Sequence, residues 1–233
     1  MVDVYTICQK ANKVLHNFIT SWRINCECPT CGCPSAGGKG NYTFRYVNPP
    51  LVYFDVPKCA SSSIRRAFFG PDESMSLRKP PVFALTRAFR FSFVRNPFAR
   101  ALSNWKMFTN VPGRKRQLRS MGGDDTADFF SFLKFCGQHK NHHWQPQSLY
   151  VPKRLDFLGR LENFTSDFAK VQSVALEFGL IEKRSQALHL NANASVTEHY
   201  SKYYGAKERE LVEELYEVDL RRFDYGFETA SEH

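Results

Sequence analysis

Two short segments carry residue types that bind phosphate, and each lies between an expected strand and an expected helix. In the first, the apolar run 51–54 leads into Lys58, and three consecutive serines then open an amphipathic helix. The free N–H groups and positive dipole end of a helix N-terminus attract anions, and a lysine adds a point charge. The predicted anion loop consists of Lys58, Cys59, Ala60, Ser61, Ser62 and Ser63.

The second segment repeats this logic about forty residues later in the chain. Phe91–Val94 reads as a buried strand, Asn96 is a good N-cap, and Pro97 suits the first position of a helix. Arg95 therefore stands where the strand ends, and Ser103 stands about two turns into the helix. A guanidinium fork and a hydroxyl at one junction indicate a second phosphate site.

The first loop is not a Walker A loop, which requires G-x-x-x-x-G-K-[ST]. It contains no glycine, and its lysine precedes the hydroxyl residues. The order Pro-Lys-x-x-Ser-Ser-Ser resembles the 5′-phosphosulfate loop of sulfotransferases, which use 3′-phosphoadenosine 5′-phosphosulfate (PAPS) as donor. The second segment resembles the 3′-phosphate signature of the same enzymes, with Arg95 and Ser103 at the matching positions.

Four further segments narrow the resemblance to the membrane-type carbohydrate O-sulfotransferases, which include chondroitin, dermatan and uronyl 2-O-sulfotransferases. They are Asn141–Gln147, Phe157–Phe164 and the C-terminal runs Leu211–Asp219 and Phe223–Phe227. The resemblance covers about residues 47–228. It implies PAPS as donor and 3′-phosphoadenosine 5′-phosphate (PAP) as product, a hydroxyl acceptor on a carbohydrate, no metal, and the Golgi lumen as location.

Sulfuryl transfer to a hydroxyl needs a base, because the acceptor oxygen loses its proton as its bond to sulfur forms. A histidine that titrates near neutrality suits this role. The family motif places a histidine directly before tryptophan, which here is His143, with His142 as runner-up. Without the flanking motifs, the pair reads as surface histidines beside a buried Trp144. Glu162 also matches a family position, where a structural ion pair is at least as good an explanation as catalysis.

Composition fits an anionic ligand and leaves two other classes to consider. The chain has 233 residues and a formal charge of +9, which favours an anionic partner. A P-loop kinase would need the missing glycine-rich loop and a Mg²⁺-binding carboxylate. A basic nucleic-acid-binding protein would leave the two junctions unexplained, and a relative acting on small molecules remains open. No apolar run reaches the roughly 18 residues of a membrane span, and the N-terminus lacks a signal-peptide pattern, so a cytoplasmic location is the alternative.

Strands that alternate with helices predict an α/β fold, P-loop-like and three-layered, with a central parallel sheet flanked by helices. We expect a sulfotransferase domain over residues 47–233, preceded over residues 1–46 by a helix and a cysteine-rich linker. Within that linker, the cluster of Cys26, Cys28, Cys31 and Cys33 allows zinc, local disulfides or a disordered segment.

The remaining chain reads as three helices, one strand and one loop. Residues 111–123, basic and glycine-rich, indicate a mobile loop, and residues 125–136 a helix. Residues 156–161 read as a core strand. Thr165 or Ser166 then caps a helix whose apolar face ends at Phe178, and a last helix over 206–220 turns Leu211, Leu215 and Val218 inward. Acceptor contacts are expected from residues 70–80 and 109–124.

Overall fold

The computed structural model describes residues 44–47, 51–69, 88–179, 181 and 198–229. Four strands form one sheet, in the order β1-β2-β3-β4. They are β1 (Phe44–Val47), β2 (Leu51–Phe54), β3 (Phe89–Val94) and β4 (Phe157–Arg160). The helices are α2 (Ser61–Phe69), α4 (Pro97–Asn110), α5 (Pro112–Ser120), α6 (Phe129–Gln138), α7 (Phe164–Glu177) and α8 (Ala206–Phe223). Short 3₁₀ turns are η1 (Gln147–Leu149), η2 (Leu161–Asn163) and η3 (Tyr200–Tyr203).

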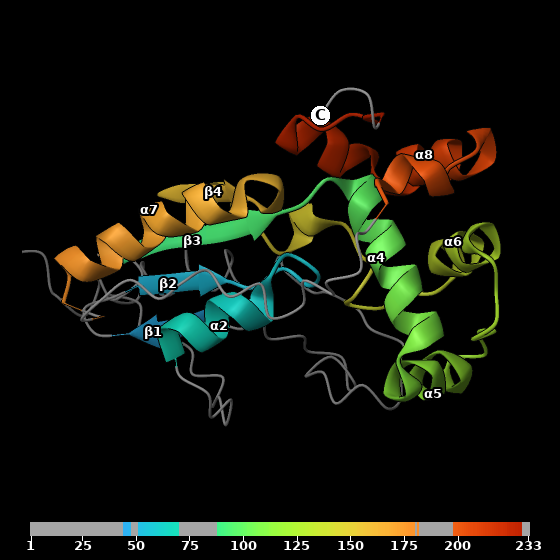
Figure 1. Ribbon diagram of the computed structural model, residues 1–233, viewed down its shortest axis with the longest axis horizontal. Coiled ribbons are helices and arrows are strands. Elements are labelled where there is room, and N and C mark those ends of the chain that lie inside the picture. Colours follow the sequence, from blue (N-terminus) through green and yellow to red (C-terminus); the bar gives the residue numbers. More distant parts are fainter. Residues whose placement is uncertain (1–43, 48–50, 70–87, 180, 182–197, 230–233) are drawn as a thin grey trace, which may run out of the picture.

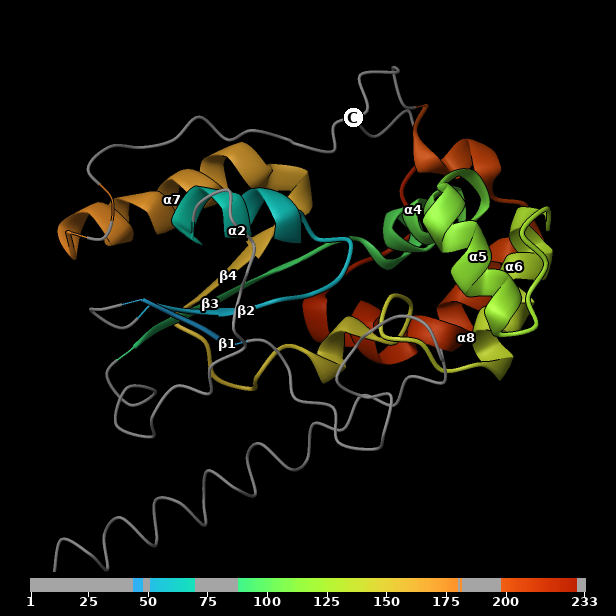
Figure 2. The same ribbon diagram turned by 90° about the horizontal axis from the view of Figure 1, so that it is seen from below.

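The strands β2, β3 and β4 run parallel, and β1 pairs antiparallel with β2. Helices α2 and α7 lie on the same side of the sheet (Figure 2). Their core contains Tyr53, Phe91 and Phe93 from the strands together with Ile64 and Phe168 from the helices. The predicted α/β fold, with a parallel sheet flanked by helices, is confirmed.

The remaining helices gather beyond the carboxyl ends of the strands, where β3 leads directly into α4 (Figure 1). A second core joins α4, α6 and α8 through Phe98, Leu102, Phe129, Leu133 and Val212. Among the described helices, none combines the length and apolar character needed to cross a bilayer.

Close packing explains why one position in the sheet is a glycine. In β4, Gly159 pairs with Phe93 of β3. A Cβ atom at this position would lie 2.3 Å from Phe93 Cε1, so the Phe93 ring occupies the space that any other residue would fill.

The basic stretch expected as a mobile loop is instead helical. Pro112 occupies the first turn of α5, and four of the next seven residues are arginine or lysine, which have good helix propensity. The stretch lacks an apolar periodicity because Leu118 is the one buried apolar residue of α5, packed with Phe108 and Phe132. The prediction of a mobile loop, made from the basic and glycine-rich composition, was therefore wrong for Pro112–Ser120.

Two side chains expected to point inward are exposed. Phe178 follows the last turn of α7 and is 44% exposed. Val218 is 54% exposed, whereas Tyr216 and Asp219 are buried. Tyr216 has non-helical dihedral angles, so α8 contains a kink that shifts its inward face.

Several predicted boundaries also differ by a few residues. Helix α6 begins after Asp128, whose side chain accepts a hydrogen bond from the Ser131 amide, and not at residue 125. Helix α7 begins directly after η2, with Asn163 in the N-cap position in place of Thr165 or Ser166.

Candidate functional site

The loop between β2 and α2 turns without glycine. Lys58 and Ala60 have φ angles of 72° and 59°, in the left-handed region that residues with a side chain rarely adopt. Such a conformation costs about 1–3 kcal/mol and persists where surrounding contacts enforce it. Here the Val56 carbonyl accepts hydrogen bonds from the Cys59 amide at 3.2 Å and from the Ser61 hydroxyl at 2.8 Å.

This loop connects the carboxyl end of β2 to the first turn of α2. The Ile64 amide donates to the Ala60 carbonyl at 3.0 Å, which places Ala60 in the N-cap position. All three serines lie within the first turn of α2, so none of them is its N-cap. The serines thus lie at the positive end of the helix, where the first-turn amides and the helix dipole favour an anion.

Lys58 lies half-buried at this loop and faces other cations. Its Nζ lies 3.6 Å from Met107 Sδ on α4, and no carboxylate of the described residues forms an ion pair with it. Burial lowers the pKa of Lys58 to about 8, and the positive charges of Arg95 and Arg114 add to this effect. A bound anion would therefore stabilise the charged form of Lys58.

Cys59 anchors the loop to the protein interior. Its side chain is fully buried, and its Sγ lies 3.2 Å from Gln147 Oε1. Burial raises the pKa of the thiol to about 12, so it stays protonated. Because its amide is also bonded to Val56, Cys59 shapes the loop without a free donor of its own.

The junction of β3 and α4 has the predicted cap. Asn96 Oδ1 accepts a hydrogen bond from the Phe98 amide at 3.0 Å, and Pro97 is the first helical residue. Arg95 precedes the cap, and its guanidinium makes no hydrogen bond or ion pair with the described residues. Burial lowers the pKa of Arg95. Ser103 lies half-buried two turns into α4, one turn before Met107, and its hydroxyl likewise contacts no described partner.

The fold brings both junctions together. Because β2 and β3 are neighbouring parallel strands, their carboxyl ends open at the same edge of the sheet. Gln147, fully buried, bridges the two junctions. Its Oε1 accepts from the Arg95 amide at 2.9 Å and from the Cys59 thiol, and its Nε2 donates to the Arg95 carbonyl at 2.7 Å.

A buried arginine links the histidine segment to the β2–α2 loop by hydrogen bonds. Arg100 of α4 is 1% exposed. Its guanidinium donates to the carbonyls of Pro57 at 3.1 Å, Gln145 at 2.9 Å and His143 at 3.0 Å. All three acceptors are neutral carbonyls, and the buried carboxylate of Asp219 attracts the Arg100 charge, which partly offsets the effect of burial in raising the pKa of Asp219.

The two predicted catalytic histidines lie side by side, with ring centroids 4.0 Å apart. The His143 ring is buried against Phe108, at a centroid distance of 5.5 Å, and neither of its nitrogens has a hydrogen-bond partner. Burial, His142 and the nearby cations Arg114, Lys58 and Arg100 hold the pKa of His143 well below its usual range. Burial and the same two arginines lower the pKa of His142 to about 4. Both imidazoles are therefore neutral near pH 7.

Glu162 has a structural role at the second junction. Its Oε1 accepts from the Asn96 amide at 2.7 Å, and its Oε2 accepts from the Tyr225 hydroxyl at 2.9 Å. It therefore links α4 to the segment after α8.

Sequence reasoning gave no role to four side chains that hold the site, namely Arg100, Asn104, Gln147 and Asp219. Asp219 accepts hydrogen bonds from the amides of Gln147 at 2.6 Å and Ser148 at 2.7 Å. It thereby fixes the turn from which Gln147 reaches both junctions. Gln147 does lie in a segment that the family resemblance had marked.

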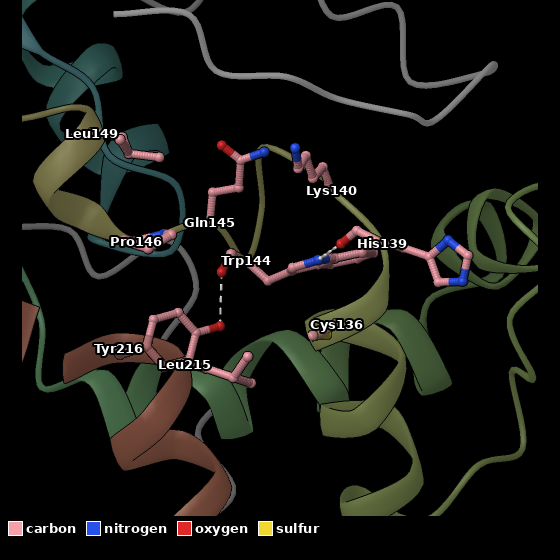
Figure 3. Close-up of a pocket in the computed structure, with 10 residues that line it drawn as sticks. Cys136, His139, Lys140, Trp144, Gln145, Pro146, Leu149, Leu215 and Tyr216 are labelled. Atoms are coloured by element: carbon pink, nitrogen blue, oxygen red, sulfur yellow. Dashed lines mark hydrogen bonds between the residues drawn. The ribbon is translucent and has the colours of Figure 1, made fainter. Parts of the chain in front are cut away.

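A pocket of about 320 Å³ lies beside the histidine segment and is separate from the two junctions (Figure 3). Trp144 and Tyr216 line it and fix each other, since the Tyr216 hydroxyl donates to the Trp144 carbonyl at 2.7 Å. The Trp144 indole donates to the His139 carbonyl at 2.8 Å. None of the predicted donor-binding residues lines this pocket.

Three predicted features lie outside the described residues. They are the helix near the N-terminus, the cysteine cluster at Cys26–Cys33 and the expected acceptor segment 70–80. Within the described ranges, no group of three or more metal-binding side chains lies together.

Comparison with known proteins supplies the family. No curated protein and no solved structure matches the chain. The model of the sulfotransferase family matches residues 44–226, which include both junctions, the histidine segment and the whole of α8. The chain therefore belongs to the sulfotransferase family.

Proposed function

We propose that this chain transfers the sulfuryl group of PAPS to a hydroxyl of a carbohydrate. The observation that carries the proposal is the shared edge of β2 and β3, where Lys58 and Arg95 repel each other and neither forms an ion pair with a described carboxylate. Among the described carboxylates, Glu162 attracts the Arg95 charge, but only at longer range. A donor with charges at both its 5′ and 3′ positions would match two cationic junctions joined by one glutamine.

The loop and α2 would hold the 5′ side of the donor. The first-turn amides and the hydroxyls of Ser62 and Ser63 surround the 5′-phosphate, while the Ser61 hydroxyl keeps the loop in shape. Lys58 neutralises charge on the bridging oxygen as its bond to sulfur breaks. Arg95 and Ser103 bind the 3′-phosphate from the neighbouring strand end.

His143 acts as the general base of this reaction. It takes the proton of the acceptor hydroxyl through an unprotonated ring nitrogen while the acceptor oxygen bonds to sulfur. The sulfur–oxygen bond to the 5′-phosphate breaks, and PAP leaves with the bonding electron pair. The anionic donor offsets the cations around the imidazole, so it raises the pKa of His143 toward a useful range.

The carbohydrate acceptor and a Golgi location are proposed from the resemblance to carbohydrate O-sulfotransferases. The net charge of +9 is compatible with an acidic glycan. A small-molecule acceptor is the alternative outcome of the test below.

The test follows ³⁵S from labelled PAPS into desulfated chondroitin, heparosan and a small phenol. We expect label in a polysaccharide, nearly complete loss of transfer in Lys58→Ala, and normal transfer in Lys153→Ala, a control at an exposed lysine. Label in the phenol alone would replace carbohydrate by a small molecule. Failure of the wild-type protein to bind PAP or to label any acceptor would contradict the proposal.

A further inference from the structure

Asn104 forms a hydrogen bond with the main chain of His143, the proposed base. It lies on α4, one turn after Arg100, and is fully buried. Its Nδ2 donates to the His143 carbonyl at 2.9 Å, beside the bond from Arg100 to the same oxygen. On the other side, the His143 amide donates to Asn141 Oδ1 at 2.9 Å. The backbone of His143 is therefore fixed at both its N–H and its C=O.

Buried polar atoms without partners lie on both sides of this contact. Asn104 Oδ1 has no hydrogen-bond partner, and neither have Nδ1 and Nε2 of His143. A neutral imidazole carries one N–H donor and one lone pair. Leaving a buried donor unpaired costs about 1–3 kcal/mol. An unpaired acceptor on Asn104 and an unpaired donor on the neighbouring His143 therefore suggest a hydrogen bond between the two side chains.

Asn104 Nδ2 contacts the main chain of the same residue whose ring nitrogens lack partners. We therefore expect Oδ1 to reach the imidazole N–H by a small adjustment of the ring, or through one bridging water, while the Nδ2 bond is kept. The rings of Phe108 and His142 pack against the His143 ring. The charged groups that lower its pKa are Arg114 from α5, Lys58 from the β2–α2 loop and Arg100 from α4. These groups are all cations, which offer no acceptor to an imidazole N–H.

We propose that Asn104 is a positioning residue that sets the tautomer of His143. Its Oδ1 accepts one imidazole N–H, which leaves the lone pair of the other nitrogen free for the acceptor proton. After transfer the imidazolium keeps its hydrogen bond to Oδ1 and carries the new proton on the other nitrogen. The inference rests on the proposed function, because it gives His143 the role of base.

The test is ¹⁵N NMR of the histidine-labelled protein bound to PAP, with His143→Gln used to assign the resonance. The wild-type protein should show His143 in one tautomer. Asn104→Ala should show a mixture or the opposite tautomer, with PAP affinity within about threefold of wild type. Asn110→Ala, at the exposed end of the same helix, should match wild type in both.

Two further readouts separate positioning from support of the fold. Asn104→Asp keeps the size and Oδ1 but adds a negative charge, so it should raise the His143 pKa by about one unit or more. Asn104→Ala should lower kcat about 10- to 100-fold with little change in KM for PAPS, a part of the roughly 10²–10⁴ that a general base supplies.

The outcomes distinguish this inference from the proposed function. If PAP binds normally and His143 keeps its tautomer in Asn104→Ala, the inference is overturned and the donor site stands. If Asn104→Ala does not fold, an unchanged His143 pKa in Asn104→Asp overturns it. A wild-type chain that does not bind PAP overturns both.

Discussion

The side chain of Gln147 and the backbone of Arg95 form a closed pair of hydrogen bonds. The Arg95 amide donates to Gln147 Oε1 at 2.9 Å, and Gln147 Nε2 donates to the Arg95 carbonyl at 2.7 Å. The two residues lie 52 positions apart in the chain. Through this pair, the segment that carries the histidines determines where the second junction places its guanidinium.

Replacing Gln147 by methionine should therefore destabilise the fold and weaken PAP binding together. The substitution leaves two buried backbone groups of Arg95 unpaired, at about 1–3 kcal/mol each. Urea denaturation measures the free energy of unfolding, and calorimetry measures PAP affinity. The control is Gln138→Met at the exposed end of α6. Equal stability of the two variants would show that the bridge is unimportant.

The lowered pKa of Lys58 predicts how PAP binding depends on pH. In the free protein its pKa is about 8, so above that pH the amine is neutral and attracts an anion less. PAP affinity should fall between about pH 7 and about pH 9, with uptake of a proton, while phosphate ionisation is already complete. Lys58→Arg stays charged and should lose this dependence. A parallel fall in both proteins would assign it to another group.

The histidine pair predicts unequal losses of turnover. His143→Ala should lower kcat by roughly 10²–10⁴ with PAPS affinity kept, because it removes the base but no donor contact. His142→Ala should have a smaller effect. The wild-type rate should fall at acid pH as the imidazole becomes protonated. Rates with ³⁵S-PAPS at saturating donor, across pH, measure all three.

Each histidine variant is the control for the other. A loss that follows His142 would exchange their roles. If neither substitution slows turnover, the base lies elsewhere, and Glu162 is the next residue to replace.

The two junctions were predictable because their signals are local. An apolar strand, the cap at Asn96 and the proline at Pro97 lie within a few residues of one another. Parallel pairing of β2 and β3 then follows from the alternation of strands and helices. The left-handed angles of Lys58 and Ala60 carry no such signal, because the loop contains no glycine.

The supports of the site were not predictable because they join distant segments. An arginine on a helix is usually solvated, yet each bond of Arg100 in the site reaches a carbonyl 43 or 45 residues away. Nothing in the local pattern of Asn104 or Asp219 identifies its partner. The kink at Tyr216 likewise changes which residues of α8 face the core, and a regular helical period does not predict such a kink.

The central claim is that the shared edge of β2 and β3 binds the two ends of one bisphosphorylated nucleotide. Calorimetric binding of PAP and of adenosine 5′-phosphosulfate, which lacks the 3′-phosphate, to wild type and Arg95→Ala tests it most directly. Arg95→Ala should weaken PAP about 10- to 100-fold, the worth of one or two charge-assisted hydrogen bonds, and should barely change the affinity for adenosine 5′-phosphosulfate. Equal losses for both ligands, or a wild-type protein that binds them equally well, would contradict the claim.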